Sequence, residues 1–153
     1  MGFWKKLFSN DVQEVDYYAE GLELMGVGKY HDALTSFRLA LRALPQDPAI
    51  LQQMAMAYTR IGMTDQAART YRQVLEQKPR SAGAHYGLAF LLLRGGQSEE
   101  GVAHLEQFLA APPDGPEAQR HVDHARSTLA ELRGEVAADP DVPPELTPGG
   151  DAT

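Results

Sequence analysis

Two histidines near the end of the chain are the residues best placed to do chemistry. His121 and His124 are three residues apart, with Asp123 between them, so their imidazoles would share one face of a helix. Two imidazoles on one helical face can hold a metal ion such as zinc. The sequence places no third ligand nearby, and we therefore expect a solvated face and no metal site.

A second candidate is the glycine-containing segment Gly26–Lys29, which could cradle a phosphate group. It follows a predicted helix rather than a strand, and it lacks the full spacing of a Walker motif. We interpret it as a turn between two helices. Glu99 and Glu100 begin another predicted helix, where acidic side chains interact favourably with the macrodipole. Because the sequence offers no acid–base pair or nucleophile arrangement, we expect neither catalysis nor a cofactor.

The composition of the 153-residue chain excludes several further classes of protein. It has no cysteine, which excludes disulfides, thiolate–metal sites and cysteine nucleophiles. No apolar run approaches the roughly 20 residues that span a bilayer. Lys5 and Lys6 interrupt the apolar residues of the N-terminus, and the small-residue cleavage site of a secretory signal does not follow. We therefore expect a cytoplasmic protein.

Charge is distributed unevenly along the chain. The net charge is −7, of which residues 114–153 carry −6 and the first 113 residues only −1. The acidity thus lies in the C-terminal part, and the sequence has no basic stripe for a phosphate backbone. This pattern argues against nucleic-acid binding.

The elements that must position these side chains recur every 34 residues. Four sets of residues follow this period: turn glycines, small residues, leucines and prolines. They are Gly28, Gly62 and Gly96; Ala33, Ala67 and Gly101; Leu41, Leu75 and Leu109; and Pro45, Pro79 and Pro113. A period of this length is typical of stacked helical hairpins, each too small to bury its apolar face alone.

Small and large residues alternate in phase with this period. The eighth place of each first helix is small and the eleventh is large. These residues are Gly21, Ala55 and Ala89, and Leu24, Tyr58 and Leu92. The pattern resembles the tetratricopeptide repeat (TPR) family over residues 14–113, about two thirds of the chain. His85 and Gly101 depart from it, and we predict a looser or differently tilted third hairpin.

The sequence therefore predicts an all-α protein, an α-solenoid of three TPR-like hairpins with a C-terminal capping helix. The repeat body is expected to span residues 11–113. Asp11 and Glu14 have the spacing of a capping box that would open its first helix. The three repeats are expected at residues 14–47, 48–81 and 82–113.

The capping helix is expected at residues 114–138. Its apolar residues are spaced three, four and three apart, which makes one stripe on an otherwise charged helix. They are Val122, Ala125, Leu129 and Leu132. The following segment, residues 139–153, is acidic and rich in proline, and we predict that it is disordered.

The TPR resemblance implies a concave groove lined by the first helix of each hairpin. Places 2, 5, 9, 12 and 13 of that helix face the groove in the family. The partner-binding residues implied here are Tyr18, Leu22 and Met25; Gln52, Met56, Thr59 and Arg60; and Tyr86, Phe90, Leu93 and Arg94. This set lacks the lysines and asparagines with which TPR domains grip the C-terminal carboxylate of chaperones.

An apolar groove with methionines suits an amphipathic helix or an apolar extended segment of another protein. Arg60 and Arg94, one repeat apart, could orient an acidic group on that segment. The alternative is that the aromatic and aliphatic members of the set pack into neighbouring helices, because a stripe at helical spacing is core by default.

The N-terminal arm, residues 1–10, is a second candidate for binding. Its apolar residues would share one helical face, and its two lysines lie mostly off that face. They are Phe3, Trp4, Leu7 and Phe8, and Lys5 and Lys6. Three interpretations stay open: the arm docks on the repeat body, lies on an anionic membrane surface, or inserts into the groove of another copy to make an oligomer.

These observations favour a non-catalytic protein–protein interaction module, an adaptor or assembly scaffold. Its concave groove would bind a helix or apolar peptide of a partner protein. The alternative function is a membrane-peripheral protein that recruits partners through its arm. The first hypothesis predicts that charges placed in the groove abolish partner recovery. The second predicts that flotation with liposomes depends on residues 1–9.

Overall fold

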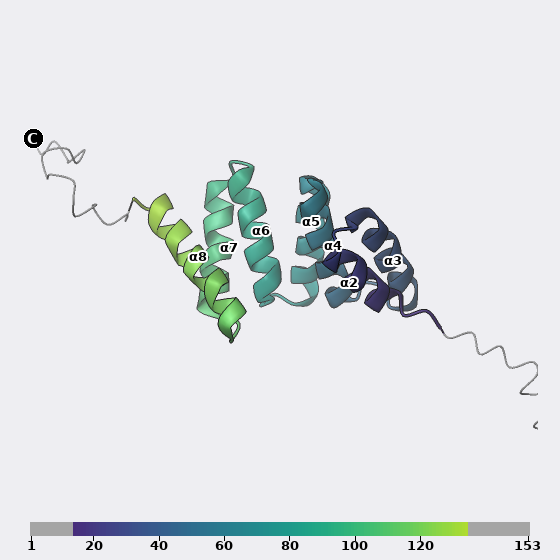
Figure 1. Cartoon of the computed structure of the whole chain (residues 1–153). Coiled ribbons are helices and arrows are strands. Elements are labelled where there is room, and N and C mark those ends of the chain that lie inside the picture. The colour runs from purple at the N-terminus through teal and green to yellow at the C-terminus, as the bar shows by residue number, and fades with distance from the viewer. Residues whose placement is uncertain (1–13, 135–153) are drawn as a thin grey trace, which may run out of the picture.

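The structure is a computed structural model that describes residues 14–134, and these residues are helical throughout apart from their turns. The helices are α2 (Tyr17–Gly26), α3 (Tyr30–Ala43), α4 (Pro48–Ile61), α5 (Thr64–Gln77), α6 (Ala82–Arg94), α7 (Ser98–Ala110) and α8 (Pro116–Leu132). Figure 1 shows three hairpins following one another, with α8 lying obliquely beyond α6 and α7. The predicted all-α solenoid is confirmed. The predicted arm (1–10), the residue Asp11 and the predicted tail (139–153) lie outside the described residues.

The first helix begins later than the capping box predicted. Residues 14–16 are not helical, and α2 starts at Tyr17. The side chain of Asp16 accepts a hydrogen bond from the backbone N–H of Ala19 at 3.0 Å and so satisfies a donor of the first turn. Asp47 caps α4 in the same way, accepting from the backbone N–H of Ala49 and Ile50.

The turn glycines and prolines act as the repeat predicts. Gly28, Gly62 and Gly96 have φ angles of 77°, 89° and 80°, a left-handed conformation in which a side chain is strained. The second helices end at Ala43, Gln77 and Ala110, two or three residues before the prolines of the repeat. Proline disfavours helical conformation in the residue before it, so the second helix of each hairpin ends shortly before the proline of its repeat.

Hairpins one and two share one apolar core with α6. Ala33, Ala55 and Ala67 are fully buried in it, and so is the ring of Phe37. A Cβ atom at Gly21 would collide with the Phe37 ring. The small residues of the repeat therefore let the helices approach closely, as predicted, while the large ones fill the space between them.

A second core joins α6, α7 and α8. It contains Leu105 and Phe108 of α7 together with the stripe of α8 formed by Val122, Ala125 and Leu129. The prediction was wrong for Leu132, whose side chain is 47% exposed, because it stands at the last residue of α8. The amphipathic helix thus covers the end of the third hairpin with one face.

The sequence predicted a looser or differently tilted third hairpin, and the structure shows that this hairpin is not loose but closely packed. A Cβ atom at Gly101 would lie 2.8 Å from Cγ of Leu93 and 3.1 Å from the backbone oxygen of Ala89. The glycine therefore lets α7 approach α6 instead of merely weakening α7. His85 is buried as well, and both of its ring nitrogens have polar partners.

Among the helices between residues 14 and 134, none combines the length and the apolarity that are needed to span a membrane.

Candidate binding groove

A groove of about 710 Å³ lies between α4, α6 and α8. Seven of the residues predicted for partner binding line it. They are Gln52, Met56, Thr59 and Arg60 of α4, and Tyr86, Phe90 and Arg94 of α6. The groove is therefore formed by hairpins two and three, with the first helix of each as a wall.

Helical periodicity brings these side chains onto one face. Gln52, Met56 and Arg60 are spaced by four residues along α4, so they form one row. Tyr86, Phe90 and Arg94 form the matching row of α6, and each lies one repeat of 34 residues after its counterpart. Matching positions of the two rows thus hold a glutamine and a tyrosine, a methionine and a phenylalanine, and two arginines.

The remaining four predicted residues do not line this groove. Tyr18 lies in a neighbouring hollow of about 670 Å³ that shares Gln52 with the groove. Leu22 of α2 is 38% exposed, whereas Met25 packs against the core of hairpins one and two. Leu93 packs against the core of α7 and α8, because Gly101 leaves room for it.

Helix α8 supplies a third wall that sequence reasoning missed. The phenol oxygen of Tyr86 lies 2.8 Å from Nδ1 of His124, whose ring stacks on Phe90 with centroids 4.5 Å apart. The ring of His121 meets Tyr86 edge-on, with centroids 4.8 Å apart. Both histidines are exposed, as predicted, but they face the groove. Their spacing of three residues was the available signal, but by itself it indicates only a shared helical face and not that this face borders a groove.

Aromatic contacts hold the α6 wall in place. The Tyr86 ring centroid is 4.8 Å from that of Phe90 and 5.1 Å from that of Phe108, which is buried. Tilted pairs at these distances are attractive beyond the area they bury. The wall is therefore rigid before any ligand arrives, which reduces the entropy lost on binding.

The groove carries positive or neutral groups. Among its lining residues the charged ones are Arg60 and Arg94, both exposed, and neither aspartate nor glutamate lines it. Burial raises the pKa of Tyr86. Burial also raises the pKa of Tyr71, although a side-chain hydrogen bond with Thr59 acts in the opposite direction. Both phenols therefore stay protonated at neutral pH and can donate hydrogen bonds. The groove thus contrasts with a chain whose net charge is −7.

Metal chemistry finds no support in the part of the chain that is described. Within residues 14–134, three His, Asp or Glu side chains do not gather in a way that could hold a metal ion. His121 bonds the backbone oxygen of Glu117 through Nδ1 at 2.9 Å, and His124 bonds Tyr86. The two imidazoles thus already have partners other than each other.

Comparison with known sequences finds similarity to a repeat family over part of the chain. The family model for the tetratricopeptide repeat matches residues 62–122. A TPR repeat-containing protein of Methanocaldococcus jannaschii is 35% identical over 60 residues, which are 39% of this chain and 11% of that protein. The chain thus spans about a tenth of the length of the curated relative it matches.

Solved structures share the architecture. The Yersinia enterocolitica type III secretion chaperone SycD, in complex with a peptide of the translocator YopD, superposes with a TM-score of 0.72 at 19% identity, over 84% of this chain and 98% of that chain. The first TPR domain of Spaghetti (RPAP3), bound to an HSP90 peptide, gives a TM-score of 0.64 at 20% identity, over 74% and 90%. At these identities the likeness concerns the fold.

Proposed function

We propose that this chain, a tetratricopeptide-repeat protein, is a non-catalytic interaction module that binds a helix or apolar segment of a partner protein in the groove between α4, α6 and α8. The module would act as an adaptor or assembly scaffold. The observation that carries the proposal is the pair of matched rows, one on α4 and one on α6, which present the exposed Met56 and the half-buried Tyr86 and Phe90 on a concave surface.

The apolar part of the groove fits a partner's apolar side chains. Met56 is 39% exposed although it stands opposite the aromatic row of α6. Methionine adapts its shape to a ligand at little cost, and Phe90 and Tyr86 offer rigid apolar faces beside it. Burying such side chains against a partner would contribute about 25 cal/mol for each Å² removed from water.

The arginine pair suggests a polarity for the bound segment. Arg60 and Arg94 stand at the C-terminal ends of α4 and α6, at the same end of the groove. A guanidinium group binds a carboxylate through two parallel hydrogen bonds, and the lining offers no acidic residue to compete. We expect a partner segment with an aspartate or glutamate at one end and apolar side chains along the rest.

The peptide complexes among the similar folds support the proposal. The SycD structure holds a peptide of the translocator YopD, and the Spaghetti domain holds an HSP90 peptide. Both show that scaffolds of similar fold can bind a peptide. The proposal itself depends on the lining residues of this chain, because the identities of 19% and 20% do not transfer a partner.

Two methionines of matched exposure allow a sharp test. Met56 in the groove is 39% exposed, and Met63 in the turn between α4 and α5 is 37% exposed. We would compare partner recovery from a native lysate by the wild type, by Met56→Glu and by Met63→Glu. Circular dichroism would establish that both variants keep the fold. A negative charge beside the aromatic row should abolish recovery through desolvation, whereas the same charge in the turn should not.

The double variant Met56→Glu plus Phe90→Glu extends the test to both walls of the groove. Recovery of the same partners by this folded variant at the wild-type level would refute the groove as the binding site. Loss of recovery with Met63→Glu as well would indicate a general effect of added charge.

A further inference from the structure

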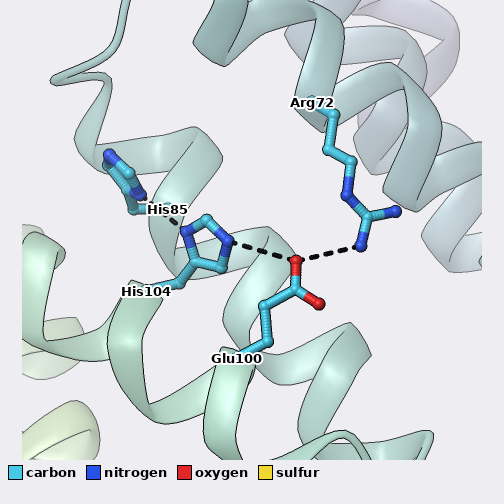
Figure 2. A network of polar contacts seen from close by, with 4 residues as sticks. All are labelled: Arg72, His85, Glu100 and His104. Carbon is cyan, nitrogen blue, oxygen red and sulfur yellow. Dashed lines mark hydrogen bonds and ion pairs between the residues drawn. The ribbon is translucent and has the colours of Figure 1, made fainter.

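A second cluster of polar side chains joins hairpins two and three away from the groove residues (Figure 2). His85 of α6 and His104 of α7 face each other, with their Nδ1 atoms 2.9 Å apart. Nε2 of His85 lies 2.7 Å from the backbone oxygen of Pro79. Nε2 of His104 lies 3.8 Å from Oε1 of Glu100, which also accepts a hydrogen bond from Arg72 of α5 at 3.1 Å.

The partners of the two imidazoles dictate where their protons lie. A carbonyl oxygen only accepts hydrogen bonds, so His85 must donate to Pro79 through Nε2–H. Nδ1 of a neutral His85 is then an acceptor, and His104 must donate to it through its own Nδ1–H. The free lone pair of His104 is therefore on Nε2, facing the carboxylate of Glu100.

We propose that this chain of groups, the His85–His104 clasp, is a proton-sensitive joint between α6 and α7 of the third hairpin, which accommodates one added proton and opens with two. The first proton goes to Nε2 of His104, where it points at the carboxylate of Glu100 and leaves the Nδ1–Nδ1 hydrogen bond intact. A second proton would have to go to Nδ1 of His85. Both Nδ1 atoms would then be donors 2.9 Å apart, and two cations, one on the buried His85 and one on the half-buried His104, would repel each other.

The surroundings oppose even the first proton. Burial is the largest cause that lowers the pKa of His104, and a charge on His85, once that ring is protonated, comes next; Arg72 lowers the pKa further, and Glu100 raises it. These are the charged groups that act on the imidazole from α5, α6 and α7. Because the pKa is lower in the folded chain, the unfolded chain takes up this proton first, and the clasp loses stabilising energy as the pH falls below the ordinary histidine value of about 6.5.

The clasp bears on how the two hairpins are held together. Arg72 belongs to hairpin two, whereas His85, Glu100 and His104 belong to hairpin three. Opening it would leave two protonated imidazoles repelling each other between α6, which forms one wall of the groove, and α7. Acid should therefore loosen the third hairpin, and with it the contacts of His85 with Pro79 and of Glu100 with Arg72, before it affects the apolar junction between the first and second hairpins. This inference does not depend on what the groove binds.

Histidine ¹⁵N spectroscopy of the whole chain tests the tautomers directly. At about pH 7.5, above the ordinary histidine pKa, His104 should give a protonated Nδ1 and an unprotonated Nε2, and His85 the reverse. Assignments would come from the single variants His85→Leu and His104→Leu. A neutral His104 with its proton on Nε2 would overturn the proposal, since Nδ1 of His85 would then have no donor.

Equilibrium unfolding between about pH 7.5 and pH 5 tests the consequence. The wild type should lose stability with acidification, and both leucine variants should show a shallower pH dependence. His85→Leu is expected to fold, because the matching position of hairpin two is Leu51, a buried core residue. His31→Gln, at an exposed site on α3, is the control and should keep the wild-type slope. Equal slopes for the wild type and both leucine variants would refute the clasp.

Discussion

The two junctions between hairpins are built on the same scaffold positions with different chemistry. In the first junction Leu51 is buried in an apolar core beside the fully buried Phe37. In the second, His85 occupies the position one repeat later and is held by hydrogen bonds to Pro79 and His104. The comparison shows that the same position of the repeat can be stabilised by apolar packing or by hydrogen bonds that require a particular protonation state.

The arginine of each second helix shows the same contrast. Arg38 donates to the phenol oxygen of Tyr58 at 3.3 Å across the first junction. Arg72, one repeat later, donates to the carboxylate of Glu100 at 3.1 Å across the second. A neutral acceptor makes the first contact insensitive to pH near neutrality, while the second belongs to an ionised network. We expect the first junction to respond to side-chain volume and the second to pH.

The largest effect should come from the apolar junction. Phe37→Ala removes a ring with no exposed surface and leaves a cavity beside Gly21. Large-to-small changes of this kind cost about 3–5 kcal/mol. Urea unfolding monitored by circular dichroism would measure the loss. A loss below about 1 kcal/mol would mean that this core can collapse around the missing ring, contrary to its close packing.

Exchanging the residues at the matching positions Leu51 and His85 should have the next largest effect. Leu51→His places an imidazole at the position that matches His85, but Thr70 stands where the second junction has His104. An imidazole buried there without its clasp partner should destabilise the chain by about 1–3 kcal/mol. The reverse exchange, His85→Leu, should cost less. Thermal unfolding of the two variants side by side checks the order, and a Leu51→His chain as stable as His85→Leu would break the comparison.

Removing the carboxylate should sharpen the proton dependence of the second junction. Glu100 raises the pKa of His104, so Glu100→Gln should lower that pKa further below its ordinary value. An NMR titration of His104 would then show its midpoint shifted to lower pH. His31, on α3, serves as an internal reference. A midpoint shifted to higher pH would show that the carboxylate does not act on Nε2.

The smallest effect is expected from the ion pair itself. The side chains of Arg72 and Glu100 are 44% and 47% exposed, so solvent screens their attraction. Arg72→Ala should cost about 0.2–1 kcal/mol, and the loss should shrink in high salt. Urea unfolding at two salt concentrations would measure both. A loss well above this range would mean that Arg72 supports the junction through packing of its apolar stem.

The repeat could be predicted from the sequence because every hairpin imposes the same steric requirements on the same positions. Left-handed turns require glycines such as Gly62, and close helix contacts require residues such as Ala67, which is fully buried. The i, i+4 rows that line the groove follow from the helix period alone. Seven of the eleven residues predicted for partner binding line one groove for this reason.

The other features of the site depend on contacts between helices that do not recur with the repeat, so the sequence pattern could not predict them. The tilt of α8 across α6 brings His124 onto Phe90, and the pattern of α8 alone indicates only which face is buried. Leu93 stands at a groove position of the repeat but fills the space left by Gly101. His85 and His104 are 19 residues apart on different helices, and only the packing of α6 on α7 brings them together.

Photo-crosslinking from the two methionine positions tests the proposed groove most directly. A photoreactive amino acid would replace Met56 or, as the matched control, Met63, and the partner recovered by pull-down would be crosslinked and its peptides identified by mass spectrometry. The groove hypothesis predicts that position 56 captures one defined partner segment with apolar residues and an acidic end, and that position 63 captures none. Crosslinking of that partner from position 63, with none from position 56, would contradict it.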